Sequence, residues 1–254
     1  MRRSLRTSTG GAIRRTRPLA FTFNGKSYWG FEGDTLASAL LANNVRTIHR
    51  SFKYHRPRGV MGSGAEEPNA IVQLGRGPST TPNLRATQVE LYDGLTARSV
   101  SGWPSIRFDL YALTGLLGRL LPAGFYYKTF MWPRFLWSWY EHHIRKAAGL
   151  GRAPSESDLD HYDKFNIHCD VLVVGGGPTG LMAALASGRT GARVIVADEQ
   201  AEMGGSLLSS TDSIGGKKPT DWINQVVSEL TRMSEVMLLP RSTVTGNYDH
   251  NFLV

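Results

Sequence analysis

A glycine-rich turn between two β-branched runs constrains this chain more than any other feature. The stretch from Cys169 to Gln200 has the sequence C-D-V-L-V-V-G-G-G-P-T-G-L-M-A-A-L-A-S-G-R-T-G-A-R-V-I-V-A-D-E-Q. The apolar run at 170–174 and the second run at 193–197 predict buried parallel strands, and Leu181 to Arg189 predicts the helix between them. This order of strand, turn, helix and strand is typical of the nucleotide-binding part of an α/β domain.

The glycines have the spacing G-x-G-x-x-G at Gly175, Gly177 and Gly180. The first permits a tight turn, the second lets the backbone approach a pyrophosphate, and the third lets the helix pack against the strand. Asp198 follows about twenty residues later, where a carboxylate accepts hydrogen bonds from a ribose. The pattern predicts a dinucleotide site for NAD or FAD, which share this fingerprint; the alternative is a structural glycine turn.

A second glycine turn, Gly204-Gly205-Ser206, is expected to face the adenosine side of the cofactor. Asp221 to Met233 then predicts an amphipathic helix, and Val236 to Leu239 predicts a third parallel strand. A complete dinucleotide-binding sheet needs more strands than the remaining chain supplies. We therefore expect residues 164–254 to form the first part of a Rossmann-like domain, and the chain to be a fragment or a truncated subunit.

The formal net charge of +8 is concentrated near the N-terminus, and no nucleic-acid-binding motif accompanies it. We expect no nucleic-acid partner and interpret residues 1–17 as an extended basic arm, with a solvated tail as the alternative. No apolar stretch approaches the roughly 18 residues of a membrane span, so we expect no membrane association.

Cys169 is the single cysteine, which excludes an intrachain disulfide and any multi-cysteine metal site. This composition favours a reducing compartment, and we expect a cytoplasmic protein. We interpret Cys169 as a buried structural thiol. His142 and His143 lack neighbouring ligands at metal spacing, so we assign no metal site.

The N-terminal region from 18 to 100 predicts a small β-rich domain. Asn24-Gly25 between two apolar runs is a strong hairpin signal, and Asp34 or Thr35 can cap a helix. The expected elements are strands at Leu19 to Phe23, Lys26 to Phe31, Ala70 to Leu74 and Val89 to Tyr92, and a helix at Leu36 to Asn43.

Two further segments have distinctive compositions. Residues 51–64 alternate basic and aromatic side chains, which could bind a phosphate or form an ordinary solvated loop. Residues 101–163 form an expected aromatic-rich helical connector and linker. Its aromatic belt, Phe125 to Tyr140, should pack within the chain or against a partner subunit.

Long segments also carry a family resemblance. They are T-F-N-G-K-S-Y-W-G-F-E-G-D-T-L-A-S-A-L-L-A-N, R-S-F-K-Y-H-R-P-R-G-V, E-E-P-N-A, V-E-L-Y-D-G-L, L-P-A-G-F-Y-Y-K-T-F-M-W-P and A-A-G-L-G-R. With these segments the chain resembles the N-terminal quarter of the α subunits of heterotetrameric bacterial sarcosine oxidases. The resemblance implies an α/β chain with a ferredoxin-like β-grasp domain at 18–100 whose relatives carry a [2Fe-2S] cluster. Residues 60–69 hold no thiolate, so we expect no Fe-S cluster here.

The resemblance further implies that the Rossmann-like domain holds NAD. The residues carried over as its binding site are Gly175, Gly177, Thr179, Gly180, Asp198, Glu199, Gly205 and Ser206. FAD, FMN and tetrahydrofolate are expected elsewhere in the complete complex, together with β, γ and δ subunits as partners.

The implied activity is oxidative demethylation of sarcosine to glycine. Oxygen is reduced to hydrogen peroxide, and the methyl carbon passes to tetrahydrofolate or leaves as formaldehyde. We assign no catalytic residue to this chain and expect it to be inactive alone. The alternatives are a self-contained FAD- or NAD-dependent oxidoreductase and a non-catalytic scaffold that binds a partner.

Overall fold

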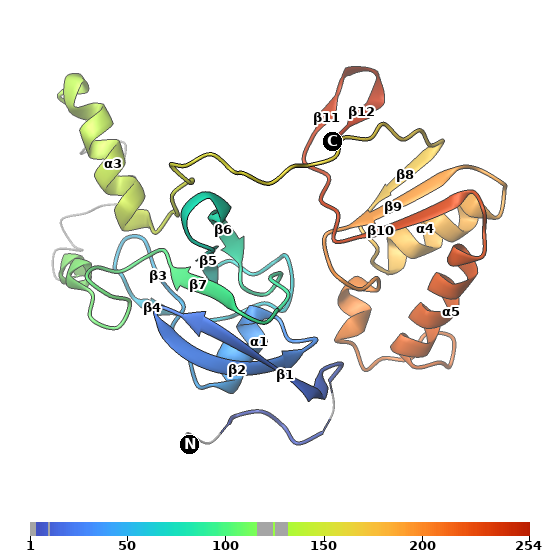
Figure 1. Cartoon of the computed structure of the whole chain (residues 1–254), viewed down its shortest axis with the longest axis horizontal. Coiled ribbons are helices and arrows are strands. Elements are labelled where there is room, and N and C mark those ends of the chain that lie inside the picture. The colour runs from blue at the N-terminus through green and yellow to red at the C-terminus, as the bar shows by residue number, and fades with distance from the viewer. Residues whose placement is uncertain (1–3, 10, 116–123, 125–131) are drawn as a thin grey trace. The chain divides into compact units, whose positions relative to one another are not determined.

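The computed structural model describes residues 4–9, 11–115, 124 and 132–254 (Figure 1). The chain divides into two compact units, Met1–Asp160 and His161–Val254. Each unit has its own hydrophobic core.

The first unit is built on a five-stranded mixed sheet with the strand order β2-β1-β7-β5-β6. β1 is antiparallel to β2 and parallel to β7, while β5 is antiparallel to both of its neighbours. The strands are β1 (Arg14–Phe23), β2 (Lys26–Glu32), β5 (Ile71–Leu74), β6 (Thr81–Arg85) and β7 (Leu95–Ser99).

The expected hairpin is confirmed by β1 and β2. Asn24 (φ 50°) and Gly25 (φ 74°) both adopt left-handed backbone geometry, as a two-residue turn matching the twist of the strands requires. The helix α1 (Leu36–Ala42) follows. Thr35 caps it by accepting a hydrogen bond from the Ser38 N–H, and the Ser38 hydroxyl accepts one from the Thr35 N–H.

The core of this unit lies between α1 and the sheet. Phe21 and Phe23 from β1, Leu36 and Leu40 from α1, and Leu95 from β7 are all buried. The alternating burial of β1 and the apolar face of α1 therefore meet in one cluster, as their periodicities predict.

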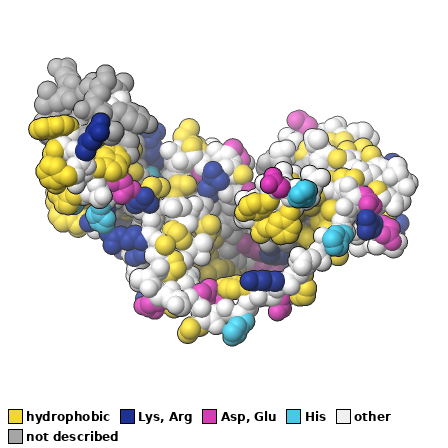
Figure 2. Space-filling model, turned by 90° about the horizontal axis from the view of Figure 1, so that it is seen from above, with side chains coloured by type: hydrophobic (Ala, Val, Ile, Leu, Met, Phe, Trp, Pro, Cys, Tyr) yellow, Lys and Arg dark blue, Asp and Glu magenta, His cyan; other side chains and the backbone are white. Residues whose placement is uncertain are grey.

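The remainder of the first unit contains short elements. They are β3 (His49–Arg50), β4 (Pro57–Arg58), η1 (Gly77–Ser79), η2 (Leu110–Gly115), η4 (Arg134–Leu136) and α3 (Trp137–Ala148). No residue of α3 is buried, and Figure 2 shows hydrophobic side chains gathered over this helix. Residues 125–131 of the aromatic belt lie outside the described residues. Of the rest, Trp132, Phe135 and Trp139 are exposed.

The second unit has a three-stranded parallel sheet in the order β10-β9-β8. Its strands are β8 (Val171–Val174), β9 (Val194–Asp198) and β10 (Val236–Pro240), and its helices are α4 (Pro178–Gly188) and α5 (Pro219–Thr231). The central strand β9 is buried along its whole length. Figure 1 shows both helices on one side of this sheet, where they contact each other.

The chain after β10 forms a small hairpin. β11 (Asn247–Tyr248) pairs with β12 (Phe252–Leu253) across η6 (Asp249–Asn251), and η5 (Gly205–Leu208) lies earlier, between β9 and α5. The three strands and two helices expected between residues 170 and 239 are all present.

Three expectations were wrong in detail. Val89 to Tyr92 is not a strand, because Glu90 makes only an isolated bridge to Thr35. The basic arm does not extend to residue 17, since β1 begins at Arg14. Cys169 is half-buried rather than buried.

The arm is also tied to the first unit. The Arg6 guanidinium forms a 2.6 Å ion pair with Asp34, whose side chain is fully buried.

Among the described residues no helix combines the length and apolar character needed to cross a bilayer. The same residues contain no cluster of three or more potential metal ligands.

Candidate cofactor site

The glycine turn follows directly from β8. The N–H of Gly175 donates to the carbonyl oxygen of Ala197 at 2.8 Å, which extends the β8–β9 pairing by one residue. Gly175 then adopts φ 102°, a conformation that L side chains rarely adopt. The chain thus turns sharply at the carboxyl end of the strand, where α/β sheets bind their ligands.

Gly177 and Gly180 face very different surroundings. A Cβ added at Gly177 meets no atom within 4 Å, so this backbone is open to an approaching group. A Cβ added at Gly180 overlaps the carbonyl oxygen of Gly175, so α4 packs directly on the turn. These are the two roles that the fingerprint predicts for its second and third glycines.

The N-terminus of α4 begins beside this open backbone. Gly177 is its N-cap and Pro178 its first residue, and the first intrahelical bond runs from the Leu181 N–H to the Gly177 carbonyl oxygen (2.9 Å). The N–H groups of Thr179 and Gly180 precede that bond and have no intrahelical acceptor. They are available to an anion, which the helix dipole also favours.

Asp198 ends β9 and is buried. One carboxylate oxygen accepts a hydrogen bond from the Gly176 N–H, and the other accepts one from the Gln200 N–H at 2.7 Å. The carboxylate therefore holds the glycine turn against the end of β9. Each oxygen keeps a second lone pair that a ribose hydroxyl can use.

The second glycine turn lies on the first. The N–H of Gly204 donates to the Gly176 carbonyl oxygen (2.8 Å), and a Cβ added at Gly205 would stand 3.0 Å from the Cα of Gly177. Met203 packs against Gly176. Sequence reasoning missed Met203, since a lone methionine in a loop carries no local signal of such a contact.

The other predicted residues lie at the edge of this group. Thr179, Glu199 and Ser206 are exposed. A cavity of about 460 Å³ begins at Met203 and continues between Leu208, Ile223 and Leu238. None of the predicted binding residues lines that cavity.

An exposed ion pair joins the amino ends of β8 and β9, opposite to the ends that carry the glycine turn and Asp198. Arg193 donates to both carboxylate oxygens of Asp170, at 2.7 and 3.1 Å. The side-chain and backbone hydrogen bonds from Arg193 lower the pKa of Asp170 to about 2. This pair precedes β8 and β9 and is remote from the glycine turn.

The basic and aromatic segment at 51–64 uses its side chains internally. Lys53 and Arg56 both stack over the ring of Tyr54, at 5.0 and 4.9 Å. His55 is buried, and its Nδ1 lies 2.8 Å from a carboxylate oxygen of Asp109. These contacts give the alternating pattern a structural explanation.

Comparisons with known proteins match two parts of the chain to two different families. Residues 16–102 match the family described as 2Fe-2S iron-sulfur cluster binding domain, and residues 170–247 match FAD dependent oxidoreductase. The chain is 56% identical to sarcosine oxidase subunit alpha of Rhizobium meliloti over 98% of its own length. It is 35% identical to the same subunit of Corynebacterium sp. (strain U-96) over the whole length of the present chain.

The chain is a homologue of the N-terminal part of sarcosine oxidase subunit alpha. It spans 25% of the Rhizobium subunit and 22% of the Corynebacterium subunit. A crystal structure of L-proline dehydrogenase from P. horikoshii shares the fold over 97% of this chain and 37% of that one, with a TM-score of 0.53 and 16% identity.

These matches correct the cofactor prediction for this sarcosine oxidase homologue. The second unit matches an FAD-dependent family, so the assignment of NAD to this chain was wrong. The first unit matches a family of 2Fe-2S iron–sulfur cluster binding domains, which contradicts the expectation that this chain holds no Fe-S cluster. The fingerprint itself could not separate FAD from NAD, because both cofactors present the same ADP moiety to it.

The loop at 60–70 of the matched domain is organised by a carboxylate. The buried Glu67 accepts hydrogen bonds from four backbone N–H groups, those of Met61 (2.6 Å), Gly62 (2.5 Å), Asn69 (2.7 Å) and Ala70 (3.1 Å). Cluster ligation in this family of folds uses cysteine thiolates, and the single cysteine of the chain lies at 169. Residues 60–70 include no cysteine, and we derive no chemistry through a cluster.

Proposed function

We propose that the chain is the FAD-binding N-terminal part of a sarcosine oxidase α subunit, with the adenine dinucleotide held by the two glycine turns of the second unit. One observation carries this proposal. Gly177 leaves open space above its backbone while Gly180, three residues on, is closed by the turn. A purely structural turn gives no reason for an open backbone beside a helix N-terminus.

The surrounding residues then take defined positions. The pyrophosphate meets the N–H groups of Gly177, Thr179 and Gly180, and the ribose meets Asp198. Glu199, Gly205 and Ser206 border the adenosine side. When bound, FAD supplies a two-electron acceptor, and the described residues supply binding and orientation.

The activity of the complete enzyme extends this proposal. We infer oxidative demethylation of sarcosine to glycine with reduction of oxygen to hydrogen peroxide, and transfer of the methyl carbon to tetrahydrofolate or its release as formaldehyde. The proposed partners are the β, γ and δ subunits, and the exposed side chains of Trp132, Phe135 and Trp139 suit a subunit contact. The proposed location is the cytoplasm. The chain alone is proposed to be inactive.

FAD binding tests the proposal directly. Apo chain is titrated into FAD, and quenching of flavin fluorescence is followed for the parent and for Gly177→Val. The valine side chain fills the space that the pyrophosphate needs, so binding should be lost while the thermal melt is retained. Ala186→Val, on an exposed position of α4, is the matched control and should bind normally.

Two results would overturn this function. One is FAD affinity in Gly177→Val within a few-fold of the parent. The other is saturable binding of NAD by a chain that does not bind FAD.

A further inference from the structure

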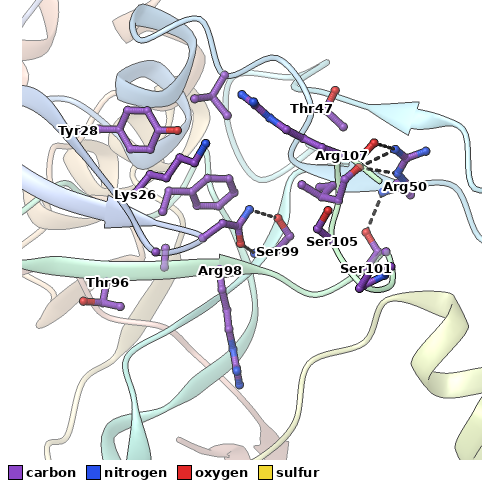
Figure 3. A pocket seen from close by; sticks show the side chains of 18 of the residues that line it. Lys26, Tyr28, Thr47, Arg50, Thr96, Arg98, Ser99, Ser101, Ser105 and Arg107 are labelled. Carbon is purple, nitrogen blue, oxygen red and sulfur yellow. Dashed lines mark hydrogen bonds between the residues drawn. The ribbon is translucent and has the colours of Figure 1, made fainter. Parts of the chain in front are cut away.

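The first unit contains a cavity of about 1350 Å³ that the proposed function does not use (Figure 3). It is bounded by the turn between β1 and β2, the segment at 44–50, the chain at 75–80 and the loop at 101–107. All of its lining residues lie between 23 and 107, so it is separate from the glycine turns of the second unit.

The lining is strongly one-sided in charge. The described residues that line it include no aspartate or glutamate, and their cationic side chains are Lys26, Arg46, Arg50, Arg76, Arg98 and Arg107. Such a concentration of like charge raises the local potential and attracts anions.

Arg50 is distinct from the others because it is buried and already bonded. Its guanidinium donates to the carbonyl oxygens of His55 (2.8 Å) and Ile106 (2.6 and 2.8 Å). Arg50 therefore anchors the loop that carries Arg107 and forms part of the cavity wall.

The other five cations are exposed, and within the described part of the chain none of them forms an ion pair. The same unit pairs its other arginines where acids are near, as in Arg14 and Arg17 with Glu32. One acid approaches the rim: Glu156 has an oxygen 3.5 Å from a Cβ built on Gly77.

Figure 3 shows how several of the lining side chains are arranged. Lys26 and Tyr28, both from β2, stand on one side, and Arg107 with Thr47 and Ser105 stands across from them. Arg98 leaves β7 in the other direction. A lysine, an arginine and two hydroxyls therefore border one space, with an aromatic ring beside it.

We propose that this cavity binds a phosphorylated small molecule of nucleotide size, with its phosphates at Lys26 and Arg107. Guanidinium groups bind phosphate oxygens in pairs, and hydroxyls such as those of Thr47 and Ser105 donate further hydrogen bonds. The half-buried Tyr28 offers ring surface to a base. The volume exceeds the roughly 300 to 1,000 Å³ of ordinary ligand pockets, so it admits such a molecule. This site is additional to the FAD site.

Calorimetric titration of the full chain tests the proposal, with ADP, inorganic pyrophosphate and adenosine as probes. All titrations use the Gly177→Val background, in which we expect no binding at the glycine turn. We expect saturable binding of ADP and weaker binding of pyrophosphate, with none of adenosine. The double variant Lys26→Gln/Arg107→Gln should weaken ADP binding roughly ten- to a hundredfold, because two charged contacts are lost.

A charge-matched control separates the site from general electrostatics. Arg58→Gln/Lys146→Gln removes one arginine and one lysine at exposed positions outside the cavity, and should leave ADP affinity within about twofold. Equal losses in the two double variants, or no saturable binding of ADP, would overturn the proposal. So would tighter binding of a decaglutamate peptide than of ADP, which would identify a protein-docking groove. Far-UV circular dichroism melts verify that each variant is folded.

Discussion

The carboxylate of Asp198 accepts the backbone N–H of Gly176, which joins the end of β9 to the centre of the glycine turn. Its second oxygen accepts the Gln200 N–H, so both oxygens are engaged by the protein. Asp198 is therefore part of the scaffold of the turn as well as its candidate ribose ligand. A substitution there should affect binding and local order together.

We expect Asp198→Asn to weaken FAD binding by roughly 1.5 to 3 kcal/mol, the value of hydrogen bonds to a charged group. The amide nitrogen must face the N–H of either Gly176 or Gln200, which places two donors against each other. Flavin fluorescence titration measures the affinity. An unchanged affinity would assign the ribose contact to another residue, with Glu199 as the neighbouring acid to test.

Substitution by alanine should lower the free energy of unfolding strongly at Gly180 and hardly at all at Gly177. At Gly180 the new methyl group overlaps the Gly175 carbonyl oxygen, so we expect a loss of about 3 kcal/mol in the free energy of unfolding. At Gly177 the methyl group meets no atom, so stability should change by less than about 1 kcal/mol. Urea unfolding followed by circular dichroism compares the two variants. A stable Gly180→Ala would show that α4 does not pack on the turn as described.

The sequence predicted those elements whose chemistry is local. Asn24-Gly25 specifies its own turn, and Thr35 with Ser38 caps α1 through contacts three residues apart. The glycine turn and β9 follow equally from short-range patterns. Each of these signals acts within a few residues, so no tertiary information is needed to detect it.

The failures depend on contacts distant in sequence. Val89 and Leu91 are apolar and buried, yet their backbone groups bond to Leu36 and Asp34 at the start of α1 and form no strand. β6 contains Pro82 and Asn83, which disfavour strands, and it forms because an edge strand tolerates them. The contact of Met203 with Gly176 likewise arises only after the second glycine turn docks on the first.

A buried charge network should be essential to the first unit. Asp109 accepts hydrogen bonds from the N–H groups of Trp103 (2.9 Å) and Tyr111 (3.2 Å), contacts His55, and lies 3.4 Å from the Arg50 guanidinium. Asp109→Ala leaves Arg50 without its buried counter-ion, and we expect a loss of roughly 3 to 5 kcal/mol in unfolding free energy.

Urea denaturation measures this loss, with the exposed Asp160→Ala as the control. The control should lie within about 0.5 kcal/mol of the parent. If the two variants unfold at the same urea concentration, the Asp109 network does not hold the loop at 101–111 to the segment at 49–58.

Glu67 should give the first unit an acid-sensitive step. Burial by itself raises the pKa of Glu67, but the hydrogen bonds from the backbone N–H groups of Gly62, Asn69, Met61 and Ala70 outweigh it, so the pKa of Glu67 lies below its ordinary value. The unfolded chain, with an ordinary glutamate pKa of about 4.3, binds the proton more readily than the folded chain. The stabilisation by Glu67 is therefore complete above that value and is lost as the pH falls through the lower pKa of the folded state.

Glu67→Gln tests this account because the four donors are divided between the two oxygens. Met61 and Gly62 donate to one oxygen and Asn69 and Ala70 to the other, so an amide nitrogen confronts two N–H groups in either orientation. We expect a loss of about 3 kcal/mol at pH 7 and a weaker decline in stability between pH 5 and 3 than in the parent, measured by urea unfolding. The exposed Glu202→Gln should keep the parent's pH profile. An unchanged profile in Glu67→Gln would mean that other carboxylates carry the acid sensitivity, and that this loop is held by its backbone alone.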